Sequence, residues 1–287
     1  MLQRNETPSQ LPELPGQRQV GAAARYVDQL AARGRVTFSI AKLCTETGLS
    51  QRAARDQLRR LANKVARVSP RKDFFVIVRP EQRAMGAPPA SWWLDAFFKM
   101  EQRPYYIALL SAAAEFGSHH QAVQEVQVIT DRPMRDLVLG RQRIRFFVKH
   151  DVATTPTITP EKAFAPVAVS SPAATALDLL RYADRIGGIS RAIEVIRGMS
   201  HQIRKPDLKR AVLAESETAN LQRMGYLLAQ LELHSEAKLV QEALPGRLQW
   251  VWFDRHEGRS AANPDQHLPI EANFRVLSYS NPVNNNE

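Results

Sequence analysis

One stretch near the amino terminus changes from helical to extended patterning in an order that few folds allow. Residues 39–47 predict a short helix with apolar side chains on its inner face. Gly48 then permits a tight turn, Leu49 can fill the angle between two helices, and Ser50 can cap the helix that follows. The pattern therefore predicts two helices that cross at a short turn.

The flanking segments complete this pattern. An Ala-rich helix is expected over residues 21–32, and the helix capped by Ser50 is expected to run from Gln51 to Asn63. Apolar strands at 65–68 and 74–78 follow, joined by residues 69–73. Three helices followed by paired strands are typical of a winged helix-turn-helix, in which the third helix can enter the major groove of DNA and the strand pair forms the wing.

The charge of the chain is concentrated in the same region. Residues 1–80 hold 15 Lys and Arg against 6 Asp and Glu, whereas residues 81–287 hold 24 against 23. Nearly all of the formal net charge of +10 therefore lies in the first 80 residues. A charge excess confined to one small module favours a dedicated polyanion-binding domain over a generally basic surface.

The exposed face of the predicted third helix carries the side chains that we expect to contact double-stranded DNA. Residues at the start of such a helix point at base edges, so Gln51, Arg52 and Arg55 are candidates for base readout, and Gln57 could read adenine. Phosphate contacts are expected from basic residues of the helix and wing, namely Arg59, Arg60, Lys64, Arg71 and Lys72. The alternative is a protein-binding winged helix whose basic face is only solvated.

The length of 287 residues suits two domains. We expect a flexible arm, a DNA-binding domain, a linker rich in Pro and Gly, a larger second domain and a polar tail. Their predicted bounds are residues 1–19, 20–80, 81–91, 92–280 and 281–287.

The second domain mixes helical and strand patterns. A helix is expected over residues 105–116, followed by strands at 126–130, 144–148 and 167–169, and Ser171-Pro172 begins another helix. After Gly187-Gly188 we expect four helices and two late strands, at residues 190–200, 207–215, 219–231, 236–244, 249–253 and 274–279. The predicted fold class is α+β, with an N-terminal winged helix-turn-helix followed by a larger mixed α+β domain.

Several stretches of this domain resemble the AbiEi-type antitoxins of bacterial AbiE toxin–antitoxin systems. They are PYYIALLSAAAEFG, VQVITDRPMRDLVLGRQRIRFF, VSSPAATALDLL with GGIS, and LQRMGYLLAQL, within residues 104–231. The resemblance implies an autorepressor that binds inverted repeats in its own promoter, with an antitoxin domain behind the winged helix. It also implies a nucleotidyltransferase toxin as functional partner, through direct contact or without it, and it carries over no catalytic residues.

The residues do not predict an enzyme. A nucleotidyltransferase needs a Gly-Ser turn and two carboxylates at alternate positions of a strand to hold Mg²⁺. Gly117-Ser118 is present, but Asp131 has no second acid at that spacing. No phosphate-binding glycine loop occurs, so we expect no nucleotide cofactor. We expect no metal site at the isolated histidines, which are His119, His120, His256 and His267.

One further basic pattern lies in the second domain. Arg141, Arg143, Arg145 and Lys149 alternate with apolar residues, which predicts a strand with a basic stripe on its solvent side. One interpretation is an edge strand protected by charge. The sharper hypothesis is that the stripe contacts a polyanion, either flanking DNA or an RNA on which the toxin acts.

The remaining features predict a cytoplasmic protein that does not enter membranes. The single Cys44 fits a reducing compartment, the first residues lack an apolar signal segment, and no apolar run is long enough to cross a bilayer. Two further hypotheses stay open beside the antitoxin. One is a winged-helix regulator with a C-terminal sensing or interaction domain and no toxin partner, and the other is an enzyme acting on nucleic acid.

Overall fold

A computed structural model describes residues 21–117, 125–256, 270–271 and 273–278. The chain divides into two compact units. Unit 1 comprises residues 1–89 and 138–141, and unit 2 comprises residues 90–137 and 142–287. Helices and strands occur in both units, which confirms the predicted α+β class.

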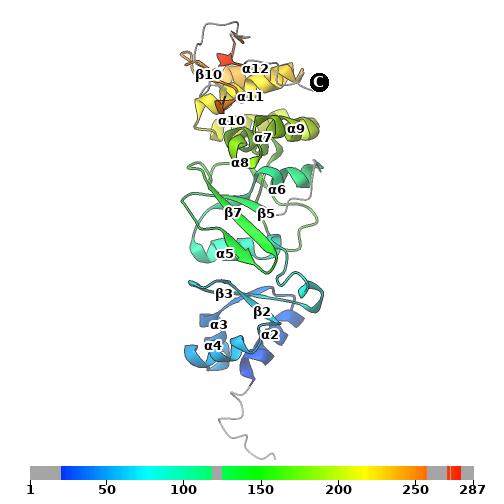
Figure 1. The fold of residues 1–287 in the computed structure, drawn as a ribbon, viewed down its shortest axis with the longest axis vertical. Coiled ribbons are helices and arrows are strands. Elements are labelled where there is room, and N and C mark those ends of the chain that lie inside the picture. The colour runs from blue at the N-terminus through cyan, green and yellow to red at the C-terminus, as the bar shows by residue number, and fades with distance from the viewer. Residues whose placement is uncertain (1–20, 118–124, 257–269, 272, 279–287) are drawn as a thin grey trace, which may run out of the picture. The chain divides into compact units, whose positions relative to one another are not determined.

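The described part of unit 1 contains three α-helices and a small antiparallel sheet. In chain order its main elements are α2 (Ala22–Ala32), β1 (Thr37–Ser39), α3 (Ile40–Thr47), α4 (Gln51–Arg59), β2 (Val65–Ser69) and β3 (Lys72–Ile77). The sheet order is β1-β3-β2, and the β2–β3 pair lies over the three helices (Figure 1). Their shared core is formed by apolar side chains from every one of these elements.

The turn between α3 and α4 forms as the sequence predicts. Gly48 takes a left-handed conformation with φ of 69°, which glycine adopts without steric cost, and Leu49 is buried. The hydroxyl of Ser50 accepts a hydrogen bond from the Ala53 amide at 3.3 Å and so caps α4. The position of α4 is therefore fixed by local residues as well as by the core.

Three details of unit 1 differ from the sequence predictions. Helix α4 ends at Arg59 rather than Asn63, because the chain turns so that Val65 can pair with Ile77 in the sheet. The hairpin loop is only two residues long, since Ser69 pairs with Lys72 and both belong to strands. Strand β1 was not predicted, because three residues are too short to establish an alternating pattern.

The main sheet of the described chain is mixed and has six strands, all of which belong to unit 2 except residues 138–139 of β6. Its strands are β4 (Tyr105–Ile107), β5 (Glu125–Thr130), β6 (Leu137–Leu139), β7 (Gln142–Val148), β8 (Thr157–Ile158) and β9 (Val169–Ser170). They lie in the order β6-β7-β5-β4-β9-β8. The β5–β7 and β4–β9 pairs are parallel, whereas β4–β5 and β8–β9 are antiparallel.

The helices of unit 2 cover both faces of this sheet (Figure 1). One face packs on α5 (Leu94–Glu101), and the opposite face packs on α6 (Leu109–Ala113) and α7 (Pro172–Arg181). The other helices are α8 (Ala183–Ile186), α9 (Ile189–Met199), α10 (Lys205–Ala214), α11 (Thr218–Gln230) and α12 (His234–Ala243). A second sheet has the order β10-β12-β11, from β10 (Val251–Trp252), β11 (Ile270–Glu271) and β12 (Val276–Leu277).

Adjacent aromatic residues of unit 2 point to opposite faces of the sheet. Tyr105 stacks on Phe98 of α5 with ring centroids 4.4 Å apart, whereas Tyr106 lies in the core beneath α7. Likewise, Phe146 contacts Phe98 of α5, whereas Phe147 lies in the same core as Tyr106. Strands β4 and β7 therefore place large apolar side chains on both faces, as a sheet buried on both sides requires.

This arrangement corrects the predicted helix over residues 105–116. Residues 105–107 form β4, and helix α6 begins only at Leu109, whose φ of 55° marks the change of direction. A continuous apolar run can be a strand or a helix, and here pairing with β5 decides for the strand. The predicted helices from Pro172 onward are confirmed to within two residues at their ends.

Candidate functional site

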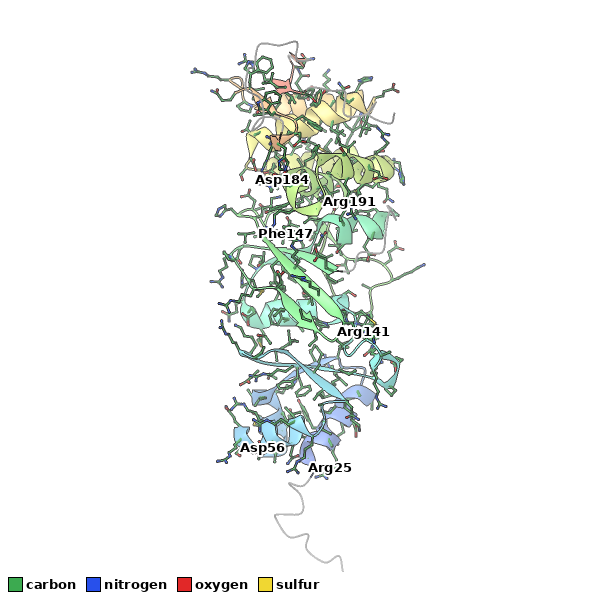
Figure 2. All side chains as sticks on the ribbon, viewed as in Figure 1. Arg25, Asp56, Arg141, Phe147, Asp184 and Arg191 are labelled. Carbon is green, nitrogen blue, oxygen red and sulfur yellow. The ribbon has the colours of Figure 1, made fainter. Side chains whose placement is uncertain are left out.

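The predicted DNA-contacting residues of α4 fall into two groups. Gln51, Arg52, Arg55, Arg59 and Arg60 are exposed on one side of the helix, while Ala54 and Leu58 are buried on the other. Figure 2 shows Asp56, which belongs to the exposed side, at the same end of unit 1 as Arg25 of α2. The exposed residues therefore form one basic helical face, which we call the α4 face.

The cations of the α4 face differ in whether they have an ion-pair partner within the protein. Arg55 forms an ion pair with Asp73 at 2.9 Å, and Arg59 pairs with Asp56 at 3.3 Å. Arg52 and Arg60 have no ion-pair partner among the described residues. The charges of Arg52 and Arg60 are therefore not compensated within the described structure, whereas the charge of Arg55 is partly neutralised by the Asp73 carboxylate.

Two of the residues predicted to contact DNA have partners within unit 1. The Gln57 side-chain oxygen accepts a hydrogen bond from the Ala23 amide at 3.0 Å, which ties α4 to the start of α2. Lys64 lies beyond the end of α4 and pairs with Asp28 at 2.9 Å. We therefore leave Gln57 and Lys64 out of the candidate interface.

The wing hairpin presents Arg71 at its tip. Arg71 is exposed in the two-residue loop, whereas Lys72 is half-buried as the first residue of β3 rather than a tip residue. Arg67 of β2, which was not among the predicted contacts, pairs with Asp73 at 2.8 Å and lies 5.9 Å from the Phe75 ring centroid. Asp73 thus joins Arg55 of α4 to Arg67 of the wing and fixes the two elements together.

The basic stripe predicted in unit 2 is not formed as expected. Arg143 and Arg145 lie on the same side of β7 and pair with Asp136 and Glu125, each at 3.3 Å. Arg141 lies before β7 in the β6–β7 turn of unit 1. Strand β7 is also not an edge strand, because β6 and β5 flank it.

Lys149 departs most clearly from the predicted basic stripe. It follows β7 directly and was expected at the solvent side, but only 3% of its side chain is exposed. Its ammonium lies 3.2 Å from Asp178 of α7 and 3.8 Å from Glu215 after α10. A buried amine is tolerated only with such partners, and two carboxylates 29 and 66 positions away could not be recognised from the strand pattern.

These three residues belong to a buried ionic network in unit 2. The Tyr106 hydroxyl donates to Asp178 at 2.9 Å, and Glu215 accepts from Asn220 at 3.1 Å and pairs with Arg181. Burial raises the pKa of Asp178, against the lowering effects of Lys149 and the Tyr106 hydrogen bond. The network connects the sheet to α7 and α11, and its buried carboxylates are closed to a surface substrate.

Asp131 is the carboxylate that was considered for a Mg²⁺ site, and its partner in the structure is an arginine. It accepts from Arg103 at 2.9 Å, and Arg103 also donates to the carbonyl of Arg132. Arg103 thus fixes the turn after β5. Over the described part of the chain, no three His, Cys, Asp or Glu side chains are arranged to hold a metal ion. His119, His120, His267 and Ser118 lie outside the described residues.

Known proteins resemble this chain both in sequence and in fold. Residues 106–230 match the family described as the AbiEi antitoxin C-terminal domain, which confirms the resemblance. The crystal structure of the RV2827C protein from Mycobacterium tuberculosis is similar over 89% of this chain and 90% of that chain, with a TM-score of 0.61 and 15% identity. At that identity the likeness shows the fold alone.

A second solved structure is the antibiotic-resistance factor ANT(2'')-Ia. The match covers 46% of this chain and 92% of the resistance factor at 16% identity, but its TM-score of 0.28 is too low to support an argument. No curated protein matches the chain. Among the described helices, none has the length and apolarity that a bilayer crossing needs.

Proposed function

We propose that this chain, whose residues 106–230 match the family described as the AbiEi antitoxin C-terminal domain, is a DNA-binding autorepressor as well as an antitoxin. In this proposal unit 1 binds an inverted repeat in the promoter of its own operon. Unit 2 counters a toxin that is a nucleotidyltransferase encoded beside it. The family match supports the antitoxin role, and the basic face of α4 supports the DNA-binding role.

The observation that carries the DNA-binding proposal is the exposed, uncompensated charge of the α4 face. Arg52 and Arg60 are exposed without an ion-pair partner among the described residues, and Arg71 is likewise unpaired at the wing tip. A helix whose inner side is fixed by a core and whose outer side is basic fits the major groove of B-DNA. The turn held by Gly48 and Ser50 presents this helix rigidly.

We assign readout and positioning to different residues. Gln51, Arg52 and Arg55 occupy the first two turns of α4, which usually approach base edges. Arg59, Arg60, Arg71 and Lys72 would hold phosphates and set the register of the helix in the groove. Two chains would occupy the two halves of the inverted repeat, because symmetric half-sites double the contacts that one small module makes.

The experiment tests DNA binding and toxin neutralisation separately, with variants of the full-length chain. The triple variant Arg52→Ala, Arg60→Ala, Arg71→Ala removes three unpaired cations from unit 1. A matched control, Lys209→Ala, Lys238→Ala, Arg247→Ala, removes three exposed cations from unit 2. Each protein is tested for repression of its own promoter and for growth rescue when the neighbouring gene is induced.

We expect the unit 1 variant to lose promoter repression and still rescue growth, while the control keeps both activities. Equal repression by the unit 1 variant and the control would contradict DNA binding through the α4 face. A harmless neighbouring gene, or failure of the wild-type chain to rescue growth, would contradict the toxin pair and favour a regulator without a toxin partner.

A further inference from the structure

Unit 1 carries a second group of basic side chains, which belong to α2, α3 and the segment between them. Helices α2 and α3 border a half-open cleft with a volume of about 740 Å³. Its lining includes Arg25 of α2, Arg33 and Arg35 after that helix, and Lys42 and Glu46 of α3. Four cations therefore surround the cleft against one carboxylate.

Three of these cations are not neutralised by the protein. Arg33, Arg35 and Lys42 are exposed and have no ion-pair partner among the described residues, in contrast to Lys64, which pairs with Asp28. Cations held close together repel one another, and this repulsion is relieved when an anion binds between them. The cleft is thus electrostatically prepared for a negatively charged ligand.

A buried hydroxyl adds an observation that is independent of the charges. Tyr26 also lines the cleft, is only 7% exposed, and its hydroxyl has no hydrogen-bond partner in the described structure. Burial raises the pKa of this hydroxyl, and Glu46 raises it further, so the group remains a proton donor. A buried donor without an acceptor is costly, which favours a ligand that supplies one.

We propose that the cleft between α2 and α3 is a binding site for a phosphate group, with Arg33, Arg35 and Lys42 as its cationic ligands and Tyr26 as a hydrogen-bond donor. Guanidinium and ammonium groups together with a hydroxyl donor match the several acceptor oxygens of a phosphate. The volume of the cleft leaves room for more than the phosphate alone. The phosphate could come from a DNA backbone beyond the half-site or from a free phosphorylated small molecule.

The test uses pyrophosphate as the probe and the full-length chain. Isothermal titration compares the wild type with Arg33→Gln/Lys42→Gln and with the control Lys238→Gln/Arg247→Gln, which removes the same charge from exposed positions of unit 2. We expect the wild type and control to bind equally and the cleft variant to bind about tenfold more weakly or worse. No binding by the wild type, or equal binding by all three proteins, would overturn the proposal.

The substitution Tyr26→Phe tests the hydroxyl without changing the ring. It should weaken pyrophosphate binding about threefold to tenfold, because one hydrogen bond is lost. The thermal midpoint of the free protein should not fall, since the hydroxyl has no partner to lose. A lower midpoint with unchanged pyrophosphate affinity would remove Tyr26 from the site.

DNA binding by the same variants identifies the source of the phosphate. If the ligand is a DNA backbone, Arg33→Gln/Lys42→Gln lowers the salt slope of binding by about 2 and pyrophosphate competes with DNA. If the ligand is a small molecule, pyrophosphate binding is lost while DNA affinity and its salt slope match the control. The pyrophosphate titration does not depend on the proposed function, so either proposal can fail without the other.

Discussion

The ammonium of Lys149 lies 3.2 Å from the carboxylate of Asp178, and both side chains are almost completely buried. Lys149 comes from the end of the sheet and Asp178 from helix α7, so this pair joins the two layers of the antitoxin domain. Glu215 adds a second carboxylate within 3.8 Å of the same ammonium. Loss of the amine would leave two buried carboxylates facing each other.

The substitution Lys149→Met should therefore destabilise the protein strongly. Met fills a similar volume but supplies no charge, and removal of one partner of a buried ion pair costs about 3–5 kcal/mol. The measurement is the free energy of unfolding from urea denaturation at pH 7. Arg143→Met is the control, because Arg143 is 60% exposed and its pair with Asp136 contributes about 1 kcal/mol or less. A similar decrease in the free energy of unfolding in the two variants would contradict a stabilising role for the buried network.

Lys149 also shows where sequence reasoning fails. Its position in the alternating run predicted an exposed side chain, because alternation describes only the strand itself. What buries Lys149 is contact with Asp178 and Glu215, which lie far away in the sequence. Likewise, the strand at residues 105–107 depends on pairing with β5, and no local signal distinguishes it from the start of a helix.

The elements that sequence reasoning placed correctly are those that short-range chemistry determines. The turn at Gly48 and the caps at Ser50 and Ser171 rest on residues within three positions of each other. The exposed side of α4 was predictable for the same reason, since helical spacing separates its basic and apolar residues. The α2–α3 cleft was not predicted, because its cations come from two helices and the segment between them.

Asp131 should make stability depend on pH below neutrality. Partial burial tends to raise its pKa, but hydrogen bonding and charge from Arg103 outweigh that effect and lower the pKa. A carboxylate with a lowered pKa in the folded state stabilises above its unfolded pKa, near 3.9, and this contribution is lost as pH falls through the folded value. Asp131→Asn should therefore cost about 0.5–1 kcal/mol at pH 7, since the side chain is about one-third exposed, and progressively less as the pH is lowered below the unfolded pKa.

A double-mutant cycle with Arg103→Gln identifies the cause of this effect. Once the guanidinium is absent, Asp131→Asn should cost less at pH 7 than it does in the wild-type background. An equal cost in both backgrounds would mean that Arg103 is not the stabilising partner. Urea denaturation at pH 7 and at a series of lower pH values supplies all the required measurements.

Gly225 is required by the close approach of a ring rather than by its backbone. A methyl group at this position of α11 would lie 2.2 Å from the Phe274 ring, and Phe274 is buried. Gly225→Ala should therefore lower the free energy of unfolding by about 1–3 kcal/mol through overpacking, although Ala has the higher helix propensity. The prediction is checked by thermal and urea unfolding of the full chain.

Two further variants show whether the clash is responsible. Gly246→Ala is the control, because a methyl group there meets no atom within 4 Å, and it should leave stability unchanged. Phe274→Leu should make Gly225→Ala less costly by shortening the side chain. If Gly225→Ala is equally costly in both backgrounds, the ring contact is not the reason for the glycine.

The roles proposed for the α4 face and the wing predict opposite effects for substitutions at two arginines. Arg52 lies in the first turn of α4, so Arg52→Ala should lose about 1–3 kcal/mol of discrimination between the operator and a duplex with altered bases. Arg71 lies at the hairpin tip, so Arg71→Ala should weaken both duplexes equally and reduce the salt slope of binding by about 1. Fluorescence anisotropy on both duplexes at several salt concentrations measures these quantities. If Arg52→Ala kept full discrimination while Arg71→Ala lost it, the wing would be the reading element and α4 the positioning one.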